Sequence, residues 1–241
     1  MFIGYPKSGH SLIGSLLDAH PDMLIAHELG TLKYIYAGFS KRQIYYLLFE
    51  NSRSFTEAGR IWGAYSYAVP NQWQGRLREL RIIGDKHGEG AVLRMRVRPW
   101  LLQRLRKTFG IDMKFIHVIR NPYDTISTLS RRRFALDLRK GMKYFFSLCE
   151  TVADIKKQIN SAHIFELKQE SFIDSPTTCL KGLCYYLGAD ASDGYLRDCA
   201  SIVFKSPHKS RYDVQWSHKL IDIVKRRMKS FPFLDGYSYD D

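Results

Sequence analysis

The most constraining feature of the sequence is a phosphate-binding pattern near its start. Residues 4–11 read Gly-Tyr-Pro-Lys-Ser-Gly-His-Ser, close to the nucleotide-phosphate loop G-x-x-x-x-G-K-[ST]. His10 stands where that loop has its lysine, and Lys7 lies three residues earlier. The apolar run 1–3 before the loop and the helical spacing of apolar residues after it predict a strand, a loop and a helix whose N-terminus attracts phosphate. We therefore expect a phosphate ligand other than a nucleoside triphosphate.

A buried strand that ends in arginine is the second informative feature. Residues 114–119 read as a strand of a parallel sheet, the kind that in triphosphate hydrolases ends in a magnesium-binding aspartate. Arg120 follows instead, and its guanidinium would repel a metal ion but offers a planar fork to a phosphate. Pro122 suits the start of a helix whose first turns carry the hydroxyls of Ser127 and Thr128. The sequence thus predicts a second phosphate site and no bound metal.

Together, these two stretches resemble the signature motifs of a known family. Residues 6–11 are similar to the 5′-phosphosulfate loop of the P-loop sulfotransferases, and residues 120–124 with Thr128 are similar to their 3′-phosphate motif. Further similarity lies in 164–188 and in 210–216, so the likeness spans nearly the whole chain. The resemblance implies a sulfotransferase that moves the sulfuryl group of 3′-phosphoadenosine-5′-phosphosulfate (PAPS) to a hydroxyl or amine acceptor, in line and without a metal.

The resemblance also implies which residues hold the donor. Family members commonly carry Thr or Ser-Thr at positions 10 and 11, so the hydroxyl contact to the sulfonate-bearing phosphate rests on Ser11 here. By register the 3′-phosphate hydroxyl falls on Thr128, with Ser127 as the alternative. The implied donor-binding residues are Lys7, Ser8, Gly9, His10, Ser11, Arg120, Thr128 or Ser127, Ser210 and Arg211.

Sulfuryl transfer needs a positive charge beside the leaving oxygen and a base beside the acceptor. Lys7 is the candidate for the first role. For the base, Glu28 ends a run similar to the segment that carries the catalytic glutamate in tyrosyl-protein and some carbohydrate sulfotransferases. His87, after Asp85 and Lys86, resembles the histidine of the cytosolic members, although its spacing differs by one residue. A glutamate at a helix start and a structural histidine are the competing interpretations, and the choice of base stays open.

The alternation of strands and helices predicts one α/β domain over residues 1–241. Its central parallel sheet is of the P-loop type, flanked by helices on both faces, with the ligand crevice at the carboxyl ends of the strands. Lys7, residues 85–87 and Arg120 all follow such strand ends. We expect strands at 2–5, 23–26, 81–84, 114–119 and 163–167, an irregular aromatic stretch at 61–73, and helices at 9–19, 28–38, 41–52, 90–107, 122–136, 138–159, 176–187, 192–203 and 217–229.

The charge and cysteine content limit the partners and the compartment. The net charge of +13 suits an anionic donor, and by itself would equally suit an anionic acceptor, nucleic acid or a membrane surface. Four cysteines without C-x-x-C spacing indicate buried thiols rather than disulfides or a metal site. We expect no transmembrane segment and a cytoplasmic protein, with a Golgi-lumenal catalytic domain that has lost its anchor as the alternative. A homodimer and the identity of the acceptor are left open.

Two other classes of function fit part of the pattern. A P-loop kinase or nucleoside triphosphatase would share the loop, but the displaced Lys7 and the arginine at 120 count against it. A non-catalytic module that binds RNA or another polyanion would suit the charge and the aromatic stretch at 61–73. The fold pattern matches no RNA-reading motif, so we expect no nucleic-acid partner.

Overall fold

The structure is a computed structural model that describes residues 1–111 and 113–241. Parallel strands form two hydrogen-bonded sections, one ordered β1-β6-β7 and the other β2-β5. Their bounds are β1 Phe2–Ile3, β2 Met23–His27, β5 Ile82–Lys86, β6 Phe115–Ile119 and β7 Ile164–Lys168, and a separate antiparallel hairpin joins β3 Ile61–Trp62 to β4 Tyr65–Ser66. This arrangement confirms the predicted α/β class with parallel strands.

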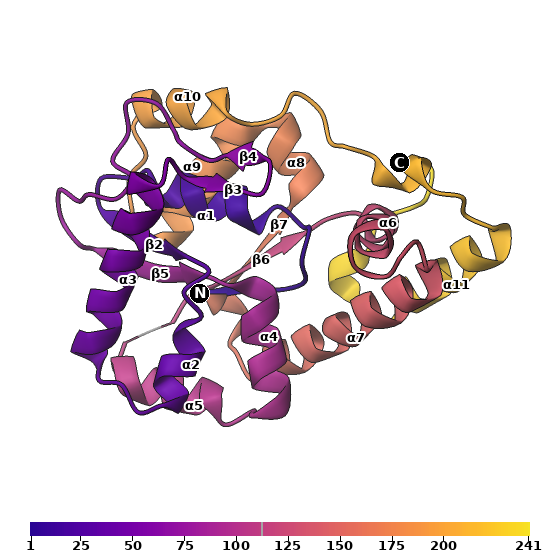
Figure 1. Ribbon diagram of the computed structural model, residues 1–241, viewed down its shortest axis with the longest axis horizontal. Coiled ribbons are helices and arrows are strands. Elements are labelled where there is room, and N and C mark those ends of the chain that lie inside the picture. The colour runs from indigo at the N-terminus through magenta and orange to yellow at the C-terminus, as the bar shows by residue number, and fades with distance from the viewer. Residues whose placement is uncertain (112) are drawn as a thin grey trace.

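Helices cover the strands on both faces (Figure 1). In this view α1 and α8 to α10 lie above the strands, and α2, α4, α5 and α7 lie below them. The bounds are α1 His10–Asp18, α2 Thr31–Tyr36, α3 Lys41–Glu57, α4 Gly88–Val97, α5 Leu101–Phe109, α6 Pro122–Arg133, α7 Leu138–Lys157, α8 Gln169–Asp174, α9 Pro176–Leu187, α10 Asp193–Ser201 and α11 His218–Met228, with short 3₁₀ turns η1 Ser161–His163, η2 Ser210–Asp213 and η3 Pro232–Leu234.

Side chains that alternate along the strands divide the core into two layers. Phe2, Ile116 and Val118 pack with α1, α8, α9 and α10. The neighbouring residues Ile3 and Phe115 point the other way and pack with α2 to α7 and α11. Because both faces are buried, β2 and β5 are apolar until their last residues, where polar groups begin; β6 is buried throughout and has one polar residue, His117, in its middle.

The strand ends place the polar groups of the chain at one edge. The loop at 4–9 follows β1, and Glu28 follows β2. In the β2-β5 ladder His27 is paired with Lys86, which brings the two strand ends level. Arg120 follows β6 in the same way. Since parallel strands share the direction of their carboxyl ends, these residues lie toward one edge, as the sequence predicts for Lys7, residues 85–87 and Arg120.

The sequence-based prediction of one helix over 90–107 is wrong. The chain forms α4 and α5 instead, with a break at Pro99. Proline lacks the N–H that an interior helix position needs and disfavours a helical conformation in the residue before it; Arg98 has φ of −137°. The stretch at 61–73 is also not wholly irregular, because it contains the β3–β4 hairpin.

Candidate active site

The loop between β1 and α1 has the backbone geometry of an anion cradle. Gly4 and Gly9 have φ of 142° and 99°, and Lys7 adopts a left-handed φ of 66°. Gly9 is the N-cap of α1 and provides no capping side chain. The first N–H groups of α1 are therefore without a side-chain cap, and such groups together with the helix dipole favour an anion.

His10 braces this loop from the inside. Its ring is buried, with Nδ1 3.0 Å from Oγ of Ser8 and Nε2 3.3 Å from the carbonyl oxygen of Ile3. Burial, with a smaller contribution from the nearby Lys86 ammonium, lowers the pKa of His10 to about 3, so the ring is neutral at pH 7. With its ring bonded inside the loop, His10 can bind a phosphate only through its backbone N–H. The sequence pattern did not show whether the backbone or the side chain of His10 would make this contact.

Lys7 presents its ammonium at the exposed side of the loop. Its backbone is fixed because Nη1 of Arg120 donates to the Lys7 carbonyl oxygen at 3.1 Å. Among residues 1–111 and 113–241 no carboxylate lies within ion-pair distance of the Lys7 ammonium. Partial burial and then the neighbouring Arg132 guanidinium lower the pKa of Lys7. Lys7 thus combines a fixed backbone with a cation that is free to meet a ligand.

Three predicted residues meet at a second polar cluster beside this loop. Nη2 of Arg120 donates to Oγ of Ser210 at 3.0 Å and to the carbonyl oxygen of His208 at 2.6 Å. The hydroxyl of Thr128 donates to the carbonyl oxygen of Asp124 at 2.8 Å and lies 3.1 Å from Oγ of Ser210. Arg120 follows β6, Thr128 lies on the next element α6, and Ser210 begins η2, so two segments far apart in the sequence supply one guanidinium and two hydroxyls.

Ser127 and Arg211 have other bonding partners in the structure. The Ser127 hydroxyl accepts a hydrogen bond from the indole of Trp216 at 3.0 Å, away from the Arg120 cluster. The Arg211 guanidinium forms a buried ion pair with Asp124, with Nη1 2.8 Å from Oδ2, and its backbone N–H donates to the same carboxylate. Thr128 therefore contacts Ser210 beside Arg120, whereas Ser127 contacts Trp216, and Arg211 fastens η2 to α6.

The two alternative bases lie side by side. Oε2 of Glu28 is 3.2 Å from Nε2 of His87, and Oε1 is 2.6 Å from Nζ of Lys86. The His87 ring lies between two glycines: a Cβ added to Gly90 would approach it to 2.0 Å, and one added to Gly30 to 3.1 Å. A side chain at Gly90 would displace the ring from Glu28, and one at Gly30 would crowd it.

Lys86 connects this pair to the phosphate loop; the sequence analysis placed it at a strand end with Asp85 and His87 but did not assign it to the site. Its Nζ donates to Oγ of Ser11 at 3.0 Å and lies 3.4 Å from Nε2 of His27. Burial lowers the pKa of Lys86, an effect that the Glu28 carboxylate opposes. Burial also lowers the pKa of His27 to about 3, so this ring is neutral and accepts from the ammonium. The available signal was a lysine at the end of an apolar strand, which is an unusual place for a charge.

Metal sites and membrane spans are both absent from residues 1–111 and 113–241. In those ranges no group of three or more His, Cys, Asp or Glu side chains could hold a metal ion. The same residues include no helix that is both long and apolar enough to cross a bilayer. The four cysteines are free thiols, and Cys149, Cys184 and Cys199 are buried.

Solved structures share this fold at low sequence identity. The sulfotransferase domain of a Synechococcus olefin synthase is 14% identical, with a TM-score of 0.60 over 95% of this chain and 92% of that chain. A sulfotransferase from Alicyclobacillus acidocaldarius is 16% identical, with a TM-score of 0.56 over 97% and 93%. A mouse sulfotransferase complexed with PAP is 13% identical, with a TM-score of 0.50 over 98% and 83%.

The sequence itself gives the stronger assignment. No curated protein matches it, but the model of the Sulfotransferase family matches residues 1–193, most of the 241-residue chain. This match favours the sulfotransferase interpretation over a kinase or a polyanion-binding module. The chain belongs to the sulfotransferase family.

Proposed function

We propose that this protein transfers the sulfuryl group of PAPS to a hydroxyl or amine acceptor. The observation that carries the proposal is the position of Lys86, whose Nζ contacts both Ser11 of the phosphate loop and the Glu28 carboxylate. A donor held by the loop would thereby have its sulfuryl end beside a carboxylate able to take a proton. Ser210 lies beyond the family match, so we propose that the functional domain extends over residues 1–241.

The donor residues follow from the two polar clusters. We assign the 5′-phosphosulfate to the backbone N–H groups of 8–11 and the hydroxyl of Ser11, at the N-terminus of α1. The 3′-phosphate is assigned to Arg120, Thr128 and Ser210, because a guanidinium with adjoining hydroxyls suits a phosphate dianion. The PAP complex of the mouse sulfotransferase supports a donor of this kind. In this assignment Arg211 acts indirectly, by holding Ser210 in place.

The transfer would form a bond between the acceptor oxygen or nitrogen and sulfur while the bond from sulfur to the bridging oxygen breaks. That oxygen leaves with the electron pair as part of the 5′-phosphate, where the Lys7 ammonium would stabilise the growing charge. The acceptor proton would pass to Glu28. Lys86 and His87 hold one oxygen each of this carboxylate, which fixes its direction. We therefore assign the base to Glu28 and an orienting role to His87.

The test is transfer of labelled sulfate from PAPS to a panel of phenols, sugars, lipids and alcohols. We expect label in an acceptor with the wild-type protein and loss of transfer by at least about 10²-fold in Lys7→Ala, since the cation acts where charge develops. Lys181→Ala is the control, because this exposed lysine lies on α9 and should leave transfer unchanged. Equal rates in both variants would contradict the role of Lys7.

The compartment belongs to the proposal as well. The buried free thiols are compatible with a reducing environment, which supports the cytoplasm over the Golgi lumen. Protease protection of the tagged protein in fractionated cells would test this, since a lumenal protein would be protected by the intact membrane.

A further inference from the structure

Glu28 lies in a strained turn. Its backbone adopts a left-handed φ of 58°, a conformation that is strained for a residue other than glycine. Residues 28–30 connect β2 to α2, so the backbone of this turn decides where the carboxylate points. Such a conformation persists only where the surrounding structure fixes it from both sides.

The entry to the turn is fixed by hydrogen bonds of β2. The backbone N–H of Glu28 donates to the carbonyl oxygen of Lys86 at 3.1 Å, which extends the β2-β5 ladder by one bond. The backbone N–H of His27 donates to Oδ1 of Asn51 at 2.6 Å. These bonds hold the chain up to Glu28 but do not reach the start of α2.

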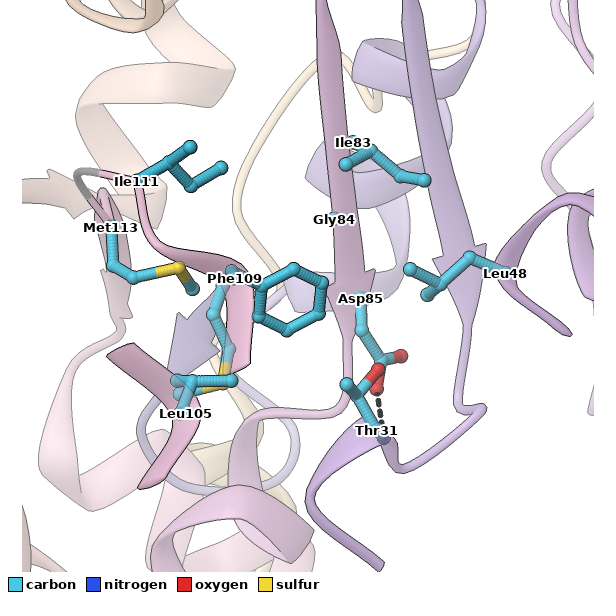
Figure 2. A pocket seen from close by; sticks show the side chains of 10 residues that line it. Thr31, Leu48, Ile83, Gly84, Asp85, Leu105, Phe109, Ile111 and Met113 are labelled. Atoms are coloured by element: carbon cyan, nitrogen blue, oxygen red, sulfur yellow. Dashed lines mark hydrogen bonds between the residues drawn. The ribbon is translucent and has the colours of Figure 1, made fainter. Parts of the chain in front are cut away.

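The exit from the turn depends on Asp85. The backbone N–H of Thr31, the first residue of α2, donates to Oδ2 of Asp85 at 2.7 Å (Figure 2). Gly30 is the N-cap of α2 and has no side chain to serve this N–H. The carboxylate of the neighbouring strand takes that place. Asp85 is also adjacent in sequence to Lys86, whose Nζ donates to the Glu28 carboxylate.

Asp85 is a costly residue for this position if only stability counts. It is 6% exposed, and burial raises its pKa. Its Oδ1 and the Thr31 hydroxyl have no hydrogen-bond partner among residues 1–111 and 113–241. They border a cavity of about 40 Å³ whose other walls include Leu48, Leu105 and Phe109 (Figure 2). A half-bonded carboxyl beside apolar walls lowers stability, and such losses concentrate where a residue serves function.

We propose that Asp85 is a positioning residue for sulfuryl transfer. Through the backbone of Thr31 it holds the turn at 28–31, so that the Glu28 carboxylate stays on Lys86, whose Nζ also contacts the loop serine Ser11. It touches neither the donor nor the acceptor. The inference rests on the proposed function, because it assigns Asp85 to the same proton-accepting carboxylate.

The kinetic test compares two substitutions at Asp85 with one at Thr31. Asp85→Asn keeps an oxygen that can accept from the Thr31 N–H, whereas Asp85→Leu has about the same size and cannot. Thr31→Val is the matched control, since it alters the same cavity but keeps the N–H. We expect kcat to fall roughly 10²-fold in Asp85→Leu, the scale of a displaced catalytic group, with the donor KM unchanged. Asp85→Asn should stay within about threefold of the wild type, as should Thr31→Val.

Two kinetic outcomes would overturn the proposal. One is a normal kcat in a folded Asp85→Leu protein. The other is an equal loss in Asp85→Asn and Asp85→Leu, because the charge and not the bond to Thr31 would then be responsible.

A second measurement does not depend on activity. Amide hydrogen exchange of residues 28–33 should be at least about tenfold faster in Asp85→Leu than in the wild type or Thr31→Val, because the exit of the turn is released. Unchanged exchange would overturn the positioning role even if the protein transfers no sulfate. Absence of transfer in the wild type together with faster exchange would instead refute the proposed function alone.

Discussion

Nε2 of His87 lies 3.2 Å from Oε2 of Glu28, so the two groups that the sequence offers as alternative bases form one pair. Because the two residues are in contact, both lie in the same part of the site. The remaining question is which of them takes the acceptor's proton. Oε1 of Glu28 also contacts Lys86, which reaches the phosphate loop, whereas His87 is enclosed by Gly30 and Gly90. On this asymmetry rests our proposal that Glu28 is the proton acceptor and that His87 orients it.

Substitution of each member of the pair should separate these roles. In Glu28→Gln the side chain keeps its shape but cannot take a proton, so kcat should fall by roughly 10²–10⁴ with unchanged affinity for adenosine 3′,5′-bisphosphate. His87→Asn should cost less than about tenfold, because Lys86 still holds the other carboxylate oxygen. Steady-state kinetics of both variants would check this. A collapse in His87→Asn with a normal rate in Glu28→Gln would move the base to His87.

The role of Lys7 predicts a split between chemistry and binding. Its ammonium should matter most when the bridging oxygen leaves, so Lys7→Ala should lower kcat by about 10² or more while product affinity changes by less than about threefold. Single-turnover rates and calorimetric titration with the bisphosphate measure the two quantities. A raised KM for donor with an intact kcat would show that Lys7 only binds.

Thr128 and its neighbour Ser127 form a matched pair for the 3′-phosphate site. The Thr128 hydroxyl contacts Ser210 beside Arg120, whereas the Ser127 hydroxyl contacts Trp216. Thr128→Val should therefore weaken the bisphosphate by about tenfold, the loss of one hydrogen bond to a charged group, without affecting AMP. Ser127→Ala should leave the ratio of the two affinities unchanged. A larger effect in Ser127→Ala would reverse the assignment.

The buried His10 predicts loss of stability in acid. Its pKa is about 3 in the folded chain, against 6.5 for a histidine exposed to solvent, so the unfolded state binds more protons between these values. The free energy of unfolding should therefore decrease as pH falls below 6.5, by about 2 kcal/mol at pH 5 from this residue. Urea unfolding at about pH 7.5 and 5 should show that His10→Asn loses correspondingly less stability than the wild type. Parallel losses would mean that the ring is not kept neutral by burial.

Local pattern was enough to propose Lys7, Arg120 and Thr128 as donor-binding residues. Each follows a strand end or lies in the first turns of a helix, where residue type and position together indicate phosphate contact. The same reasoning placed His87 at the shared edge, since parallel strands share the direction of their ends, whereas Glu28 was proposed from the family resemblance. This reasoning gave the positions of residues along the chain but not the directions of their side chains.

The directions of side chains required the tertiary structure. The bridge from Lys86 to Glu28 depends on the register of β2 against β5, which pairs His27 with Lys86 and involves residues 59 positions apart. His10 turns inward because Gly4 and Gly88 leave room for its ring, since a Cβ at either would lie 3.0 Å or less from it. Neither contact could be predicted from sequence patterns, because each depends on how separate segments pack together.

Titration with adenosine 3′,5′-bisphosphate and with AMP, both in EDTA, tests the central claim most directly. We predict that the bisphosphate binds at least about 30-fold more tightly than AMP, because Arg120, Thr128 and Ser210 contact only the 3′-phosphate, and that EDTA has no effect. Equal affinity for the two nucleotides, or binding that requires Mg²⁺, would contradict the assignment of PAPS as the donor.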